Sequence, residues 1–179
     1  RWVCPERGII APDRFIPLAE ETGLISAVTS RMVDLACKDC QAWRAAGHTL
    51  PIAVNLSVDN LNNLDLPDEI GSKIEQYNLD RSCLSFEITE SQLLKKIAEP
   101  MEVLARLRIM GFDLSVDDFG TGYSNLQIVR EFPFSELKID RSFVTNAKTD
   151  DKARASVEMC VELGKKFNLR IVAEGVETI

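Results

Sequence analysis

Histidine is almost absent from this chain, and its rarity narrows the chemistry that the chain can perform. His48 is the only histidine among the 179 residues. It lies just beyond the helical pattern that stops at Gly47, which disfavours a Ser-His-Asp triad, and a single histidine disfavours a histidine-rich zinc centre. We therefore expect any general base to be a carboxylate, a lysine or a metal-bound hydroxide.

Basic residues are also scarce relative to acidic ones. The chain has 21 Lys and Arg residues against 28 Asp and Glu residues, a formal net charge of −7. Binding to a nucleic-acid backbone without sequence preference needs a basic surface, so we expect no nucleic-acid polymer as a partner. The acidity has two interpretations, ordinary solubility or carboxylates gathered to hold cations, and only the positions of the carboxylates can decide between them.

Long apolar runs are missing as well. No run approaches the length that crosses a membrane, and the first residues lack the layout of a signal peptide, so we expect no membrane segment and a cytoplasmic location. The five cysteines are an odd number and form no disulfide framework. Cys37 and Cys40 form a C-x-x-C within an apolar helical pattern, which favours packing over the minor alternative of zinc or redox chemistry.

The chain alternates short β-rich runs with helical patterns and shows no repeat or long linker. The β-rich runs are residues 52–56, 83–88, 113–116, 137–139 and 170–173. Helix-period patterns lie between them, such as the one that runs from about Ser26 and stops at Gly47. Repeated β-α-β order predicts a parallel sheet. Secondary structure alone does not choose between an open doubly wound sheet and a (β/α) barrel.

Polar residues close every β-rich run, where a buried strand has no packing reason to carry them. They are Asn55, Glu87 with Glu90, Asp117 with Asp118, Lys138 with Asp140, and Glu174 with Glu177. In a (β/α) barrel such residues converge on one face, where active sites are built. A single acidic residue at a strand end more often caps a helix, and Glu90 and Asp140 keep that alternative. Five such endings together favour a barrel with a functional site.

The chemistry of these endings favours divalent cations. Carboxylate and amide oxygens suit Mg²⁺ or Mn²⁺. Asp117 and Asp118 are neighbours at a strand end, where the alternation of side chains between the two faces of the sheet breaks down. Both side chains can therefore reach the mouth of the barrel and serve two ions. Paired ions about 3.5–4 Å apart activate water and stabilise the leaving oxygen in phosphodiester hydrolysis. Lys138, between apolar neighbours, is placed to orient the attacking water or to neutralise phosphate charge.

Taken together, these segments resemble the EAL phosphodiesterase family over essentially the whole chain. The matching motifs are N-L-S at 55–57, E-x-T-E at 87–90, D-D-F-G-x-G-Y-S at 117–124, K-I-D at 138–140 and A-E-G-V-E-T at 173–178. The resemblance implies a TIM-like (β/α) barrel that hydrolyses cyclic-di-GMP to linear pGpG with two Mg²⁺ or Mn²⁺ ions. A catalytically silent EAL-like receptor for cyclic-di-GMP is the alternative.

The resemblance also implies roles for single residues. Asn55, Glu87 and Asp117 correspond to ligands of one metal, and Asp117 would bridge to a second ion held with Asp118 and Glu174. Lys138 and Glu174 are the expected catalytic residues. Arg1 and Asp140 are expected at the nucleotide, and Glu90 and Glu177 are expected to support the loop and the metal constellation.

The sequence departs from the family pattern at both ends. It opens at Arg1, after the glutamate of the E-A-L motif, and it stops at Ile179, before the last barrel elements. A full barrel typically has ~250 residues, so we expect one domain over 1–179 that is a barrel incomplete at both ends. We expect weak or absent turnover from this piece by itself, sensory or regulatory domains in the parent protein, and a homodimer.

Overall fold

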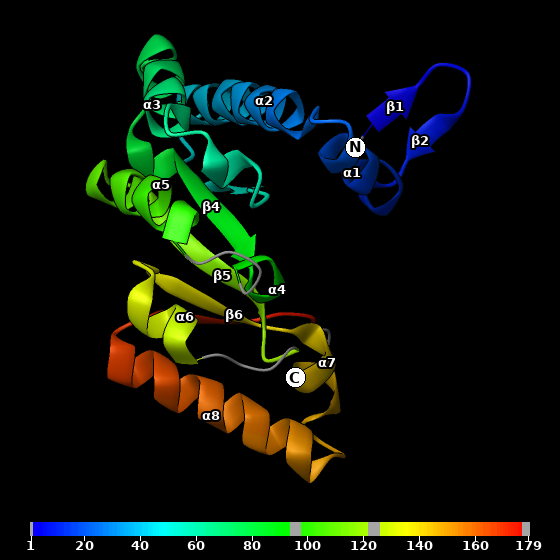
Figure 1. Ribbon diagram of the computed structural model, residues 1–179, viewed down its shortest axis with the longest axis vertical. Coiled ribbons are helices and arrows are strands. Elements are labelled where there is room, and N and C mark those ends of the chain that lie inside the picture. Colours follow the sequence, from blue (N-terminus) through cyan, green and yellow to red (C-terminus); the bar gives the residue numbers. More distant parts are fainter. Residues whose placement is uncertain (1, 94–97, 122–125, 177–179) are drawn as a thin grey trace.

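The computed structural model describes residues 2–93, 98–121 and 126–176, and its elements alternate between strands and helices (Figure 1). The strands are β1 (Trp2–Cys4), β2 (Gly8–Ile10), β3 (Ile52–Asn55), β4 (Leu84–Thr89), β5 (Asp113–Phe119), β6 (Glu136–Ile139) and β7 (Arg170–Ala173). The helices are α1 (Pro12–Glu21), α2 (Ile25–Ala45), α3 (Leu66–Gln76), α4 (Glu90–Leu93), α5 (Ala98–Ile109), α6 (Leu126–Glu131), α7 (Arg141–Asn146) and α8 (Asp151–Phe167), with 3₁₀ turns η1 (Asn60–Asn62) and η2 (Arg81–Cys83).

The strand order decides between the two predicted sheet architectures. Strands β3 to β7 form one parallel sheet in consecutive order, β3-β4-β5-β6-β7. A doubly wound sheet would reverse its order partway, whereas consecutive strands with right-handed crossovers carry all their helices on the same face. This is the arrangement of a (β/α) barrel, and the predicted TIM-like class is confirmed. Strands β1 and β2 form a separate antiparallel hairpin, which the sequence analysis did not predict.

The two faces of the sheet differ because side chains alternate along each strand. On β4, Leu84, Phe86 and Ile88 are buried against the helices, while Glu87 and Thr89 point to the opposite face. The register pairs Asn55 with Glu87, and Thr89 with Asp117. The helix-covered face is therefore apolar, and the inner face carries the polar side chains of several neighbouring strands.

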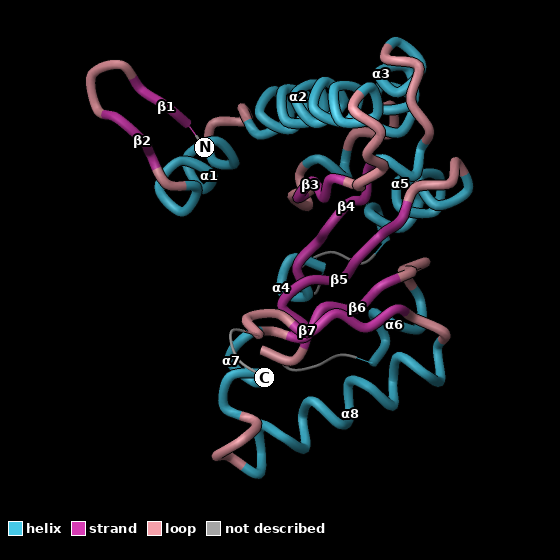
Figure 2. Tube along the Cα trace, turned by 180° about the vertical axis from the view of Figure 1, so that it is seen from behind, coloured by secondary structure: helices cyan, strands magenta, loops and turns pink. Residues whose placement is uncertain are grey.

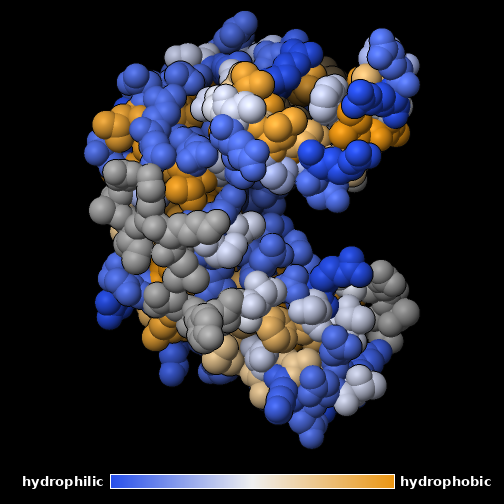
Figure 3. All heavy atoms as spheres, turned by 45° about the vertical axis from the view of Figure 1, so that its right-hand side comes forward, coloured by the Kyte–Doolittle hydropathy of each residue, from blue (hydrophilic) through white to orange (hydrophobic). Residues whose placement is uncertain are grey.

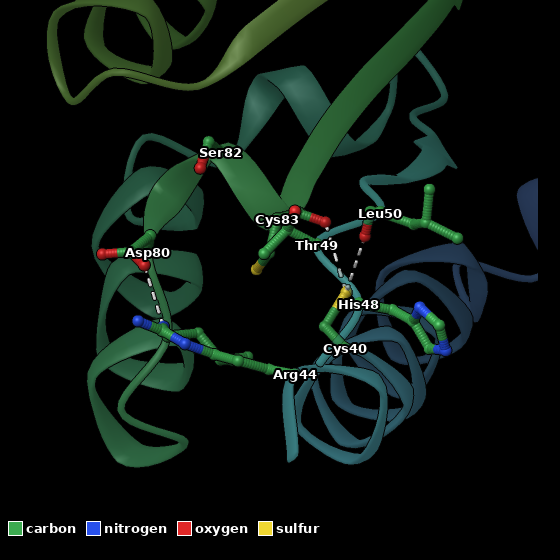
Figure 4. A pocket seen from close by; sticks show the side chains of 9 residues that line it. Cys40, Arg44, His48, Thr49, Leu50, Asp80, Ser82 and Cys83 are labelled. Carbon is green, nitrogen blue, oxygen red and sulfur yellow. Dashed lines mark hydrogen bonds and ion pairs between the residues drawn. The ribbon is translucent and has the colours of Figure 1, made fainter. Parts of the chain in front are cut away.

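The C-x-x-C of α2 belongs to the apolar core, as the packing interpretation predicts. Cys37 and Cys40 are buried, and the Cys40 thiol donates to the carbonyl of Cys83 at 3.3 Å (Figure 4). Burial, chiefly, raises the pKa of Cys37 to about 11 and that of Cys83 to about 12. These thiols therefore stay protonated near neutral pH, which disfavours metal binding and redox chemistry because both need the thiolate.

Several strand boundaries differ from the sequence-based prediction: β3 ends at Asn55 instead of residue 56, β4 ends at Thr89 instead of residue 88, and β6 begins at Glu136 instead of residue 137. Cys83 lies in η2, so β4 begins one residue later, and β5 continues to Phe119 instead of ending at Val116. The extension of β5 exists because Phe119 pairs with Ile139 after a shift in register, which local sequence does not reveal. Among the described residues, no helix is long and apolar enough to cross a membrane.

Candidate functional site

Lys138 lies at the centre of a cluster of carboxylates on the inner face of the sheet. Its Nζ lies 2.6 Å from Glu174 Oε1, 3.1 Å from Glu87 Oε1 and 3.1 Å from Asp117 Oδ1. The side chains of Lys138 and Glu87 are each only 12% exposed. One ammonium group is thus shared by carboxylates from three different strand ends.

The sheet topology explains why these residues meet. Glu87 lies on β4, Asp117 on β5 and Lys138 on β6, and Glu174 follows directly after β7. The backbone N–H of Glu174 donates to the carbonyl of Ile139 at 3.1 Å, which continues the β6–β7 pairing by one step. Because the strands are parallel and consecutive, their carboxyl ends lie along a single edge.

Asp118 joins the cluster through a break in the alternation of β5. The register of β5 against β6 shifts between Val116 and Phe119, and Asp118 has a left-handed φ of 53°. The Asp118 N–H donates to Asp117 Oδ1 at 3.1 Å. As a result, carboxylate oxygens of Asp117, Asp118 and Glu174 all lie within 4.8 Å of one another. Two adjacent carboxylates therefore reach the same edge, as expected from the sequence.

The pKa shifts reflect crowding of negative charge. Burial, opposed by Lys138, raises the pKa of Glu87, and burial followed by the charge of Asp117 raises that of Asp118. Burial works to lower the pKa of Lys138, but its hydrogen bonds to Glu174, Glu87 and Asp117 prevail and raise it. Three carboxylates thus contact one ammonium, the carboxylate of Asp118 lies beside two of them, and the excess negative charge favours a cation.

The donor set fits a hard divalent cation. Asp117, Asp118 and Glu174 are the only group of three or more potential metal-binding side chains of this kind among the described residues. They offer oxygen ligands alone, which suit Mg²⁺-type ions and not the softer metals that prefer thiolates. Asn55 pairs with Glu87 across β3 and β4, so an amide oxygen adjoins the same edge.

Two further predicted residues support the loops around the cluster. Glu90 is 1% exposed, and its Oε2 accepts the N–H of Gly120 at 3.0 Å, just after the Asp117–Asp118 pair. Asp140 caps α7 by accepting the N–H of Ser142 at 2.9 Å, and the hydrogen bonds of Ser142, chiefly, lower its pKa. Asp140 therefore caps a helix, which is one of the two roles that the sequence left open for it.

The comparison with known families agrees with this geometry. The family model described as EAL domain matches residues 1–179. The chain belongs to the EAL domain family. Its sequence is 42% identical to the bifunctional diguanylate cyclase/cyclic di-GMP phosphodiesterase MucR of Pseudomonas aeruginosa, over 99% of this chain and 26% of MucR. It is 40% identical to the cyclic di-GMP phosphodiesterase NbdA of the same organism, over 99% of this chain and 23% of NbdA.

Solved structures give the same result. The structure of the MucR phosphodiesterase in complex with c-di-GMP matches with a TM-score of 0.90 at 42% identity, over 99% of this chain and 72% of that chain. The FimX EAL domain, at 20% identity and a TM-score of 0.89, shares the fold. The EAL domain described here spans about a quarter of the length of the curated relatives it matches.

Some predicted residues of this EAL domain fall outside the described residues. Arg1, expected at the nucleotide, and Glu177, expected to support the metal constellation, are both among them. The same holds for residues 122–124 of the predicted loop.

Sequence reasoning missed a hollow beside Asn55. Figure 3 shows one side of the molecule hollowed between the part that carries α1 and α2 and the part that carries α7 and α8. A cavity of about 410 Å³ borders the end of β3. Its lining includes Phe15, Ile16, Val28, Met32, Asn55 and Thr89. No local pattern marks it, because its walls come from helices and strands that are distant in the chain.

Sequence reasoning also missed a second polar network, at the amino ends of the strands. Arg170 Nη2 lies 3.0 Å from Asp113 Oδ2, and Arg170 Nε lies 2.9 Å from Glu136 Oε2. Each of these residues begins a strand, so polar residues at strand starts were the available signal.

Proposed function

We propose that this EAL domain hydrolyses cyclic di-GMP to linear pGpG in a metal-dependent reaction. The observation that carries the proposal is the grouping of Asp117, Asp118 and Glu174 within 4.8 Å of one another, beside Lys138. The names of MucR and NbdA, which are at least 40% identical to this chain, support the substrate. The match to the MucR phosphodiesterase in its c-di-GMP complex supports it further.

Two ions, Mg²⁺ or Mn²⁺, are the cofactors that we assign to this site. Asn55, Glu87 and Asp117 would hold one of them, and Asp117, Asp118 and Glu174 would hold the other. Such ions supply Lewis-acid stabilisation of the charge on the reacting phosphodiester. Asp117 is the natural shared ligand, because it contacts Lys138 together with Glu87 and also lies within 4.8 Å of Asp118 and Glu174.

Lys138 contributes a fixed positive charge in this reaction. Its hydrogen bonds to Glu174, Glu87 and Asp117 raise its pKa, and as an ammonium it can donate hydrogen bonds. It would orient the attacking water or neutralise charge on the phosphate. Glu174, 2.6 Å from its Nζ, would hold the ammonium in place.

The remaining assignments concern the substrate and the setting of the domain. Arg1 and Asp140 would contact the nucleotide, while Glu90 and Glu177 would support the loop and the metal constellation. We further propose that the domain acts in the cytoplasm, as a homodimer, within a multidomain signalling protein. The two activities in the name of MucR support a multidomain setting.

The decisive experiment follows product formation by the protein in its natural length. Cyclic di-GMP is incubated with the protein and Mn²⁺, and pGpG is measured by chromatography with and without EDTA. Lys138→Met should lower kcat by roughly 10²–10³-fold, since a preorganised charge at the reacting group is lost. Lys152→Met, which removes an exposed lysine at the start of α8, should leave kcat unchanged.

The same assay separates hydrolysis from simple binding. Binding of cyclic di-GMP measured by calorimetry, without pGpG formation in Mn²⁺, would show a catalytically silent receptor and refute the enzymatic proposal.

A further inference from the structure

Helix α7 packs against the two chain segments that carry Asp118 and Glu174. Figures 1 and 2 both show α7 at the carboxyl end of the sheet, beyond β6. A Cβ on Gly120, in the segment after Asp118, would lie 2.9 Å from Cε2 of Phe143 on α7. A Cβ on Gly175, directly after Glu174, would lie 2.7 Å from Cβ of Arg141. The helix therefore approaches both backbones as closely as glycine permits.

Gly120 is fixed on two sides. Its N–H is held by Glu90 Oε2 at 3.0 Å, and the ring edge of Phe143 stands against its Cα. Its φ of 101° lies in a region that side chains other than glycine rarely adopt. A hydrogen bond fixes the direction of the peptide plane, but it leaves the chain free to tilt about that bond. The Phe143 ring opposes this tilt.

The position of Gly120 determines the conformation of Asp118. Asp118 is held at a φ of 53°, which costs free energy for a residue with a side chain, so its surroundings must enforce it. The Thr121 N–H and hydroxyl both donate to the Asp118 carbonyl, at 3.3 and 2.9 Å, and close a tight turn. Gly120 lies inside this turn, so a shift of Gly120 would move Asp118 away from Asp117 and Glu174.

Phe143 is itself firmly placed. Asp140 caps the helix, and the Phe143 ring packs against the apolar core of the domain. The contact thus connects a rigid core to the strained segment. We propose that Phe143 is a positioning residue for the metal group of Asp117, Asp118 and Glu174, acting through Gly120. This inference rests on the proposed function, because it requires that Asp117, Asp118 and Glu174 hold a metal ion.

The test measures Mn²⁺ binding directly, by electron paramagnetic resonance and calorimetry, on the protein in its natural length. Phe143→Leu keeps an apolar side chain in the core but lacks the Cε2 and Cζ atoms that reach Gly120. It should weaken one of the two Mn²⁺ sites about tenfold, a typical effect of losing support behind a ligand. Phe143→Tyr keeps the ring and should bind Mn²⁺ as the wild type does.

Val144→Ala is the matched control for a loss of packing. Val144 is the next residue on α7 and also packs against the core, but the three heavy atoms nearest to a Cβ on Gly120 all belong to Phe143. Thermal unfolding without metal should show comparable stability for Val144→Ala and Phe143→Leu, whereas only Phe143→Leu should lose Mn²⁺ affinity. Raising the Mn²⁺ concentration should restore kcat of Phe143→Leu. If Phe143→Leu fails to fold, Phe143→Met replaces it.

The outcomes separate the two proposals. Wild-type Mn²⁺ affinity in a folded Phe143→Leu protein would overturn the role of Phe143 while leaving the proposed hydrolysis intact. An equal loss of affinity in Val144→Ala would also overturn it, because general packing would then explain the effect. Absence of Mn²⁺ binding by the wild type would overturn both proposals.

Discussion

Asp113 and Asp117 lie four residues apart on β5 and point to the same face of the sheet, yet their surroundings differ. Asp113 forms ion pairs with Arg170 (Oδ2 to Nη2, 3.0 Å) and with Arg108 (Oδ1 to Nη1, 3.3 Å). Arg170 also pairs with Glu136 (Nε to Oε2, 2.9 Å). Two carboxylates there meet two guanidinium groups. Around Asp117, by contrast, the Lys138 ammonium contacts three carboxylates, and that of Asp118 lies beside two of these.

The amino ends and the carboxyl ends of the strands therefore differ in how their charges are balanced. At the amino ends, carboxylates and guanidinium groups pair with one another within the protein. No ion from solution is needed to balance their charge. At the carboxyl ends, burial, followed by the charges of neighbouring carboxylates and opposed by Lys138, raises the pKa values of Glu87 and Asp118, and a bound cation would relieve this cost. The same face of one sheet therefore carries paired charges at one end and a candidate cation site at the other.

The largest expected effect comes from exchanging a carboxylate for an amide at each end. Asp117→Asn should lower kcat for cyclic di-GMP at least about 100-fold, because the shared metal ligand is lost. Asp113→Asn, the matched control on the same strand and face, should keep kcat within about twofold and cost about 1 kcal/mol in the free energy of unfolding. Steady-state kinetics and urea unfolding measure both. Similar losses of kcat in the two variants would contradict the proposal that Asp117 serves the reaction and Asp113 serves stability.

Metal removal should have an intermediate effect on the midpoint of thermal unfolding, and this effect should depend on the carboxylates at the carboxyl ends of the strands. Mn²⁺ at one hundred times its Kd stabilises a binding state by about 2.7 kcal/mol. The midpoint of the domain's thermal unfolding should then rise by about 5–10 °C over the value in EDTA. Asp113→Asn should show the same rise and Asp117→Asn little of it. A rise of full size in Asp117→Asn would place the cation elsewhere.

The smallest effect concerns acid stability at the amino ends. Burial works to raise the pKa of Asp113, but hydrogen bonds from Arg170 and Ser135 prevail and lower it. A carboxyl with a lowered folded pKa contributes stability that is present above its unfolded value of about 3.9 and disappears as pH falls through the folded value. Arg170→Met should therefore cost less than about 1 kcal/mol at pH 7, since the pair is partly exposed, and almost nothing at very low pH.

Urea unfolding of Arg170→Met and wild type across this pH range gives the measurement. Arg154→Met is the control, because Arg154 pairs with the exposed Asp151 three residues away on α8. A cost for Arg170→Met that grows as pH falls would contradict the assigned role of Asp113.

The inner-face site could be predicted from sequence because its signal is local. Glu87 and Asp117 stand out at the ends of β-rich runs, and parallel strands bring such ends together whatever the details of packing. The packing role of Cys37 and Cys40 was likewise readable, because the helical period alone places them on the buried side of α2.

Other features were decided only by the tertiary structure. The register shift that turns Asp118 toward Glu174 depends on how β5 meets β6, and the contact of Phe143 with Gly120 joins segments more than twenty residues apart. The choice of a barrel geometry likewise required the order of all five strands. The sequence by itself determined which residue types stand at each strand end, since that follows from the alternation of a single strand. How closely these side chains approach one another was decided by sheet order, register and helix packing, because these arise from contacts between distant parts of the chain.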